Sequence, residues 1–187
     1  MIQKYYLRFV PTAKVDYTLI LNLYDLADYN TETNCFDTVR YRSLAELAQQ
    51  LGTTEKTLCR HLNKEDYKHF LSIDKKTREI RLIVDFKKTG YKVPFLTLSP
   101  VEVRVLREKN EDLLYRYFIY LKYYCGYSAN KRIDTTEKQI LSAIGYSSNS
   151  SYIQKLSAYN TELSQKGIIN IKKYRDDKGK IRNIYSF

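Results

Sequence analysis

The residues best suited to bind a ligand in this sequence lie around two short turns, each built on a glycine. Around the first turn the chain reads RSLAELAQQLGTTEKTLCRHL, from position 42 to position 62. Ala48, Gly52 and Leu58 supply a small residue, a turn residue and an apolar residue at a spacing that lets two helices cross closely. This spacing is typical of a helix-turn-helix, whose second helix lies in the major groove of DNA.

The second helix of this motif carries polar and charged residues on the face opposite its apolar residues. An apolar seam is predicted at Leu44, Leu47, Leu51 and Leu62. The predicted DNA contacts on the opposite face are Thr54, Glu55, Lys56, Cys59, Arg60 and Asn63. Because Glu55 would repel phosphate, contact of this helix with a protein instead of DNA stays open.

The second turn follows Gly145, which lies 93 residues after Gly52. This turn is two residues longer than the first, and Leu141 replaces the small residue of the first motif. The predicted DNA contacts here are Asn149, Ser150, Ser151, Gln154 and Lys155. Hydroxyl groups and a helix N-terminus suit phosphate, and Asn and Gln can hydrogen-bond to adenine edges. The predicted buried seam of this helix is Ile153, Leu156 and Leu163, with either Tyr159 or Asn160.

A basic β-hairpin is predicted after each motif, and it would act as a wing beside the second helix. The predicted wing contacts are Lys75, Lys76, Arg78, Lys172, Lys173, Arg175, Lys178, Lys180 and Arg182. Each cation placed on a phosphate releases a counterion, so binding through such wings depends strongly on salt.

The sequence offers little to catalysis. His61 and His69 are the only histidines, and they do not form the His-x-His pair with which rolling-circle nucleases hold a metal ion. There is no G-x-x-x-x-G-K-[ST] loop for a nucleotide. The three cysteines, Cys35, Cys59 and Cys125, contain no C-x-x-C pair, which disfavours a zinc site and favours a reducing compartment. We therefore expect no enzymatic activity, no cofactor and no metal.

The charge of the chain favours a polyanionic partner. Lys and Arg number 32 against 21 Asp and Glu, a formal net charge of +11. Residues 1–90 hold 15 basic and 12 acidic residues, net +3, and residues 91–187 hold 17 and 9, net +8. Nucleic acid is the first candidate and an acidic membrane surface the second. Without a long apolar run or a signal peptide at the start, the sequence predicts a cytoplasmic protein with no membrane partner.

Hydrophobic periodicity predicts the same order of elements twice: helix, strand, helix, turn, helix, hairpin. In the first half the helices are predicted over 17–29, 44–51 and 55–69, and the strands over 36–41, 71–73 and 80–84. In the second half the helices are predicted over 101–106, 113–124, 137–145 and 150–166, with a strand over 132–135 and a hairpin turn at 176–179. The prediction is an α+β, mainly helical fold of two tandem winged helix-turn-helix domains, residues 1–90 and 91–187, joined near residues 87–94.

The second half resembles the winged-helix domains of plasmid replication initiators and phage replisome organisers of low-GC Gram-positive bacteria. The resemblance rests on FLTLSPVEVRVL, TTEKQILSAIG and IQKLSAYNTELSQKGIINIKKYRDDKGKIRNIYSF, and it covers the first half more loosely. It implies binding to DNA at an origin or an operator. These motifs are shared with many transcription regulators, so they specify the fold better than the biological role.

Three functions stay open at this point. The first is sequence-specific recognition of double-stranded DNA in replication initiation or transcriptional control of a mobile element, and two rigidly joined modules would then cover roughly 20 base pairs. The second is a replisome accessory factor that binds DNA non-specifically and docks a replisome protein through the first module. The third is single-strand binding by Tyr120, Tyr123, Tyr124 and Tyr127, whose spacing fits a packed helix face better. The oligomeric state, monomer or homodimer, also stays open.

Overall fold

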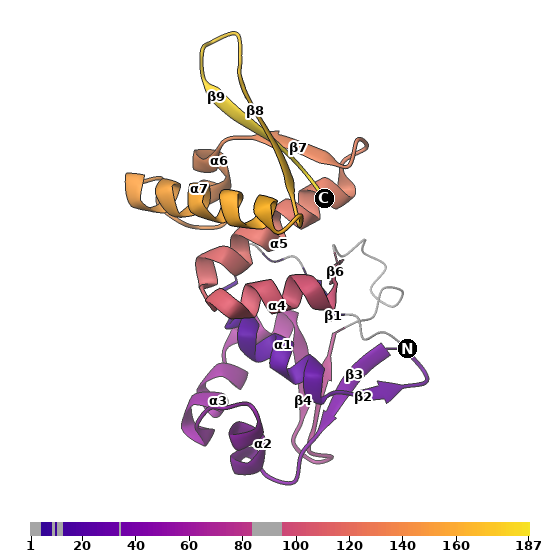
Figure 1. Cartoon of the computed structure of the whole chain (residues 1–187). Helices are drawn as coiled ribbons and strands as arrows, with labels where there is room; N and C mark the ends of the chain where they lie inside the picture. The colour runs from indigo at the N-terminus through magenta and orange to yellow at the C-terminus, as the bar shows by residue number, and fades with distance from the viewer. Residues whose placement is uncertain (1–4, 9, 11–12, 34, 84–94) are drawn as a thin grey trace. The chain divides into compact units, whose positions relative to one another are not determined.

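The computed structural model describes residues 5–8, 10, 13–33, 35–83 and 95–187 as an α+β fold (Figure 1). The chain divides into two compact units, Met1–Arg107 and Glu108–Phe187. The expected junction at residues 87–94 and the expected strand residue Val84 lie outside the described residues.

The boundary between the units falls after Arg107 and not after residue 90, and two contacts of the first unit explain the difference. Strand β6 (Phe95–Leu98) pairs antiparallel with strand β1 (Tyr5–Arg8), so FLTL is a strand of the first unit. Helix α4 (Pro100–Lys109), longer than the predicted 101–106, carries Arg107, whose Nη2 donates to Asp25 Oδ2 at 2.6 Å. Residues 95–107 therefore belong with the residues that precede them.

The first unit contains the predicted order of helices and strands. Its remaining elements are α1 (Tyr17–Leu26), β2 (Asp28–Asn30), β3 (Cys35–Arg40), α2 (Leu44–Gln50), α3 (Glu55–Leu62), the 3-10 helix η1 (Glu65–His69), β4 (Leu71–Asp74) and β5 (Glu79–Leu82). The four-stranded sheet has the order β2-β3-β5-β4 and all its pairs are antiparallel.

Helices α2 and α3 each begin directly after an N-capping residue. Ser43 Oγ accepts from the Glu46 N–H at 3.1 Å, and Thr54 Oγ1 accepts from the Thr57 N–H at 3.2 Å. Between the helices Gly52 has φ +66, a conformation that a residue with a side chain rarely adopts. The predicted seam is confirmed at Leu47, Leu51 and Leu62, which are buried together with Ala48 and Leu58, whereas Leu44 is only half-buried.

The predicted helix over 55–69 is wrong in its second half. Helix α3 ends at Leu62, and the extended backbone of Lys64 (ψ 138) turns the chain before η1 begins. The turn allows Tyr67 to be fully buried, where its hydroxyl accepts from the Asp16 N–H at 2.8 Å and contacts His61 Nδ1 at 2.9 Å. A continuous helix would carry Tyr67 away from these partners.

The second unit repeats this order of elements. It consists of α5 (Asp112–Tyr127), β7 (Arg132–Thr135), α6 (Glu137–Ala143), α7 (Ser150–Gln165), β8 (Asn170–Arg175) and β9 (Ile181–Ser186). Its sheet has the order β7-β9-β8, which matches the order β3-β5-β4 of the corresponding strands in the first unit. The two units thus share both the order of elements and the pairing of their strands.

A buried polar network holds the helices of the second unit to strand β9. Asn160 of α7 accepts a short hydrogen bond from the Tyr117 hydroxyl of α5, and its Nδ2 lies 3.3 Å from the Tyr185 hydroxyl of β9. Asn183 Nδ2 donates to Glu137 Oε1 of α6 at 3.1 Å. These hydrogen bonds join side chains of different elements and so hold α7 in its place, while Asn183 Oδ1 is buried without a hydrogen-bond partner among the described residues.

The buried seam of α7 begins later than the sequence predicts. Leu156 and Leu163 are buried, and so are both Tyr159 and Asn160, between which the sequence left the choice open. Ile153, expected in the seam, is only half-buried. The first turns of α7 therefore project beyond the core of their unit.

Candidate nucleic-acid interface

The outward face of α7 is exposed along its length and is polar except at Ala158. At 100° per residue, Ser151, Gln154, Ala158 and Thr161 lie opposite the buried Leu156, and all four are exposed. The sequence predicted contacts only for the first two of these four. The spacing i, i+3, i+7, i+10 was the signal that could have added Ala158 and Thr161.

Asn149, one of the predicted contacts, caps the N-terminus of α7. Its Oδ1 accepts from the Tyr152 N–H at 2.9 Å, and its Nδ2 donates to Ser147 Oγ at 3.1 Å. Both ends of the amide are therefore engaged, so Asn149 cannot read a base without losing the cap. Gln154 is the amide on the exposed face that is placed to do so.

Lys155 is exposed but already paired. Its Nζ lies 3.2 Å from Glu111 Oε2, and the same oxygen accepts from the Tyr159 hydroxyl at 2.7 Å. The hydrogen bonds from Tyr159 and Lys155 lower the pKa of Glu111 below its ordinary value. Lys155 would have to exchange this carboxylate for a phosphate, which makes it a weaker candidate than the sequence predicts.

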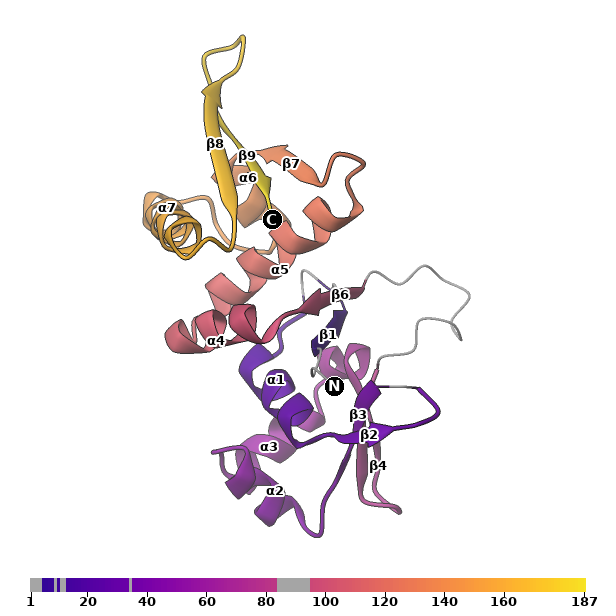
Figure 2. The same cartoon turned by 45° about the vertical axis from the view of Figure 1, so that its right-hand side comes forward.

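The hairpin of β8 and β9 extends beyond the helices of its unit (Figures 1 and 2). Its turn is fixed by Asp176, whose Oδ1 accepts from the N–H groups of Lys178 at 3.0 Å and Lys180 at 2.9 Å. Gly179 has φ +73, and its N–H donates to the Asp176 carbonyl at 2.8 Å. These bonds hold Lys178 and Lys180 at the exposed tip.

Strand register divides the cations of this wing between two faces. Lys173 pairs with Asn183, and Arg175 pairs with Ile181. Because side chains alternate along a strand, both cations lie on the face of the hairpin that also carries the buried Tyr185. Lys172 lies on the other face, opposite Ile184. The face shared with the core is the one turned toward the helices, so Lys173 and Arg175 are better placed than Lys172 to act together with α7.

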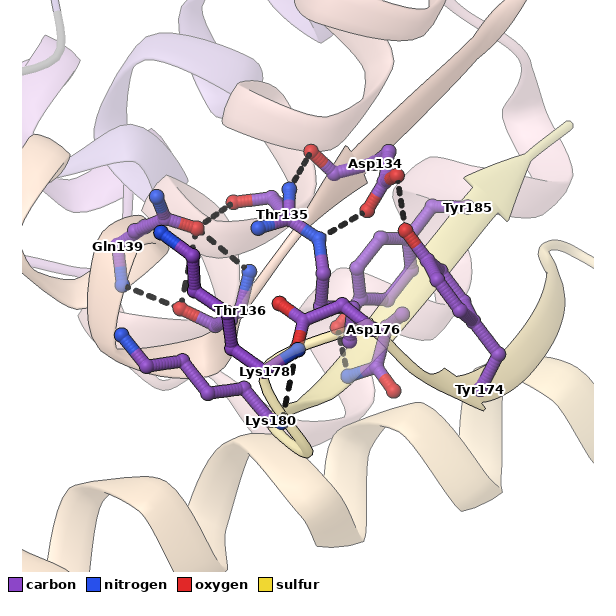
Figure 3. A network of polar contacts seen from close by, with 11 residues as sticks. Asp134, Thr135, Thr136, Gln139, Tyr174, Asp176, Lys178, Lys180 and Tyr185 are labelled. Atoms are coloured by element: carbon purple, nitrogen blue, oxygen red, sulfur yellow. Dashed lines mark hydrogen bonds and ion pairs between the residues drawn. The ribbon is translucent and has the colours of Figure 1, made fainter.

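Arg182 is tied to the neighbouring strand. Its Nε donates to Asp134 Oδ1 of β7 at 2.8 Å, and its Nη2 donates to the Asp134 carbonyl at 3.2 Å. Figure 3 shows Tyr174 on the same carboxylate, to which its hydroxyl donates at 2.5 Å. The hydrogen bonds from Tyr174 and Arg182 lower the pKa of Asp134, so the carboxylate stays charged and keeps Arg182. This cluster ties the part of the hairpin next to its turn to strand β7, a role that the sequence did not predict.

A groove lies between α6, α7 and the hairpin. It has a volume of about 550 Å³, and its lining includes Lys138 of α6, Ile153 of α7 and Lys180 and Ile181 of the hairpin. Within it Thr136 and Gln139 form a complete capping box at the start of α6 (Figure 3). The half-buried Ile153 thus forms part of the wall between helix and wing.

In the first unit the predicted contacts also lie at the surface. Thr54, Glu55, Lys56, Arg60, Asn63, Lys75, Lys76 and Arg78 are exposed, and Cys59 is half-buried. Thr54 serves as the N-cap of α3 and Asn63 as its C-cap. Arg78, in a left-handed turn with φ +55, donates to the carbonyl of Arg42 at 2.8 Å.

The tyrosines in the last turns of α5 differ in their exposure to solvent. Tyr120 is buried, whereas Tyr124 is 41% and Tyr127 60% exposed. The expectation of a packed face is therefore wrong for these two. Their rings contact other tyrosines, with centroids 4.5 Å apart for Tyr120 and Tyr124 and 4.7 Å apart for Tyr123 and Tyr127.

No protein-family model, curated protein or solved structure matches this chain. No helix in the described part of the chain combines the length and the apolar composition needed to cross a membrane.

Proposed function

We propose that this protein binds double-stranded DNA in a sequence-specific manner through a winged helix formed by its second unit. Helix α7 enters the major groove, and the hairpin of β8 and β9 follows the adjacent phosphates. The first unit has the same order of elements and is a second winged helix.

The observation that carries this proposal is the combination on the second unit of a polar projecting helix and a basic hairpin. Ser151 and Gln154 offer hydrogen-bonding groups that fit base edges and phosphates. Lys173 and Arg175 on the inner face of the hairpin, with Lys178 and Lys180 at its tip, are exposed cations suited to phosphate. No carboxylate lies within 4.0 Å of these four cations among the ion pairs of the described residues.

A selection from random oligonucleotides tests the proposal. The full chain is incubated at about 150 mM salt with a duplex pool and, in parallel, with a single-stranded pool. Enrichment of one duplex motif supports sequence-specific recognition. Retention of duplexes without a motif contradicts the sequence-specific part, and preferential retention of single strands points instead to the exposed tyrosines of α5.

The biological role that we propose is replication initiation or its control on a plasmid, phage or other mobile element. It is supported by the resemblance of the second half to replication initiators and replisome organisers. The place where the enriched motif occurs in DNA distinguishes the two roles. Repeats of the motif at a replication origin favour an initiator, and a single copy at a promoter favours a transcription regulator.

A further inference from the structure

The first unit has a groove of its own at the position that corresponds to the groove of the second unit. Its volume is about 410 Å³, and it lies between the start of α2, the second half of α3 and the hairpin of β4 and β5. Pockets of about 300–1,000 Å³ are the size that proteins use for small ligands or a few inserted side chains.

The walls of this groove carry several apolar side chains. Leu44 of α2, Leu62 of α3 and Ile73 of β4 line it together with the ring of Tyr41. Leu44, Ile73 and Tyr41 are half-buried, so part of each side chain faces the groove and water. The corresponding groove of the second unit has two aliphatic lining residues, Ile153 and Ile181, and one acidic lining residue, Glu137. Half-exposed apolar groups gathered in one depression are typical of an interaction site.

The rim of the groove is cationic. Arg42, Lys75 and Arg78 line it, and none of its ten lining residues is acidic. The hydrogen bond from Arg78 to the Arg42 carbonyl fixes two of these residues next to each other. An occupant that matches both walls and rim carries apolar side chains flanked by carboxylates.

DNA fits this site less well than it fits the second unit. A phosphate backbone in the groove would cover Leu44, Leu62 and Ile73 with charged oxygens, which gain nothing from apolar walls. The exposed Glu55 in the first turn of α3 would also repel phosphates. The strands of this hairpin have four residues each, against six in the second unit, so they offer a shorter track for a backbone.

We propose that this groove of the first unit docks a partner protein through an acidic segment with apolar anchor side chains. An extended or helical segment places one or two apolar side chains between α3 and the hairpin, and its carboxylates meet Arg42, Lys75 and Arg78. The protein then connects DNA, held by its second unit, to a second protein. The docking stands on the first unit alone and does not depend on the DNA proposal.

The test begins with a selection from displayed random peptides of about 12 residues against the full chain, which requires no knowledge of the partner. The enriched peptide is then synthesised with a fluorescent label, and its affinity is measured by anisotropy. We expect peptides that combine at least two carboxylates with Leu, Ile or Phe. The absence of enrichment, or enrichment of peptides without carboxylates, would overturn the proposal.

Cys59 reports whether the peptide occupies this groove. It is the half-buried cysteine of α3 and lines the groove, whereas Cys35 and Cys125 are buried. The bound peptide should slow alkylation of Cys59 by iodoacetamide at least fivefold, while the enriched DNA duplex should not. An unchanged alkylation rate with peptide, or protection by the duplex, would show that the assigned occupant is wrong.

Charge reversals separate the two sites. The exposed pair Arg42→Glu and Lys75→Glu should weaken the peptide by roughly tenfold, because each exposed ion pair contributes little on its own. This double variant should keep its affinity for the duplex, and thermal unfolding like that of the wild type shows that its first unit is folded. The matched control Lys178→Glu in the second wing should weaken the duplex and leave the peptide unchanged. Equal peptide affinity for both variants would contradict the cationic rim, and loss of DNA binding alone would contradict only the proposed function.

Discussion

At the scale of single residues, the two amides at the start of α7 have different tasks. Asn149 caps the helix with its Oδ1, and Gln154 is exposed on the outward face. Asn149→Ala should lower the free energy of unfolding by about 0.5–2 kcal/mol, the usual effect of losing an N-cap. Asn149→Ser should restore the stability, because a serine hydroxyl caps equally well.

Gln154→Ala should instead change the DNA sequence that the protein prefers. A bidentate contact between an amide and adenine discriminates against other bases by about 1–3 kcal/mol, so the variant should lose its preference at one position of the selected motif. Thermal unfolding should stay as in the wild type, because the side chain is exposed. A Gln154→Ala protein that enriches an unchanged motif would show that this residue does not read a base.

His61 gives the first unit a dependence on pH. Burial, followed by repulsion from Lys64, holds the pKa of His61 below its ordinary value of 6.5. The Tyr67 hydroxyl already accepts from the Asp16 N–H, so its own hydrogen is available to the unprotonated Nδ1 of His61.

Because the unfolded chain takes up the proton at a higher pH than the folded chain does, stability should fall as the pH drops below about 6.5. Urea titrations at about pH 7, 6 and 5, followed by NMR signals of the first unit, should show a smaller advantage of the wild type over His61→Gln at each step. A constant difference between the two proteins across this range would exclude the effect.

At the scale of elements, the alternation of side chains along β8 predicts unequal roles for neighbouring lysines. Lys173 lies on the face of the hairpin that continues the core, and Lys172 lies on the opposite face. Lys173→Ala should weaken binding to every duplex alike and reduce the slope of log K against log salt by about 0.9, the value for one lost phosphate contact. Lys172→Ala is the matched control and should leave the slope unchanged. Equal slopes for both variants would mean that the wing does not approach DNA by its inner face.

The sequence was sufficient for elements that depend on local signals. The predicted starts of the short helices at positions 44, 55 and 137 are confirmed, and each follows a capping residue, Ser43, Thr54 and Thr136. The turn predicted at Gly52 is confirmed by its positive φ. Strand β6 was missed because its partner β1 lies some ninety positions earlier, and no local pattern reports such a pairing.

The sequence also did not show which charged side chains form ion pairs with one another. Arg182 is engaged by Asp134 and Lys155 by Glu111, each through a partner more than 40 positions away. Composition predicted both residues as DNA contacts, since it records the charge of a residue but not the neighbour that already neutralises it. The split of the wing into two faces likewise required the register of β8 and β9.

At the scale of the whole molecule, the two units repeat one arrangement of elements but differ in their surfaces. Glu108–Phe187 holds 14 basic and 8 acidic residues within 80 positions, and Met1–Arg107 holds 18 and 13 within 107. In the first unit several of these cations are paired, since Glu79 binds both Arg40 and Arg81 at 3.1 Å. The two units therefore share the order of their strands and differ in the residues that line their grooves.

This difference predicts the length of DNA that one chain contacts. If both units held DNA, a monomer would protect roughly 20 base pairs, about two helical turns. With the first unit docked to a protein segment, a hydroxyl-radical footprint on the selected site should cover only about 10 base pairs, one turn. The double variant Arg42→Glu, Lys75→Glu should give the same footprint as the wild type, and the enriched peptide should not shorten it. Protection of two turns that the double variant reduces to one would assign DNA to the first unit as well, because only a unit in contact with the duplex can lose protection when its own cations are reversed.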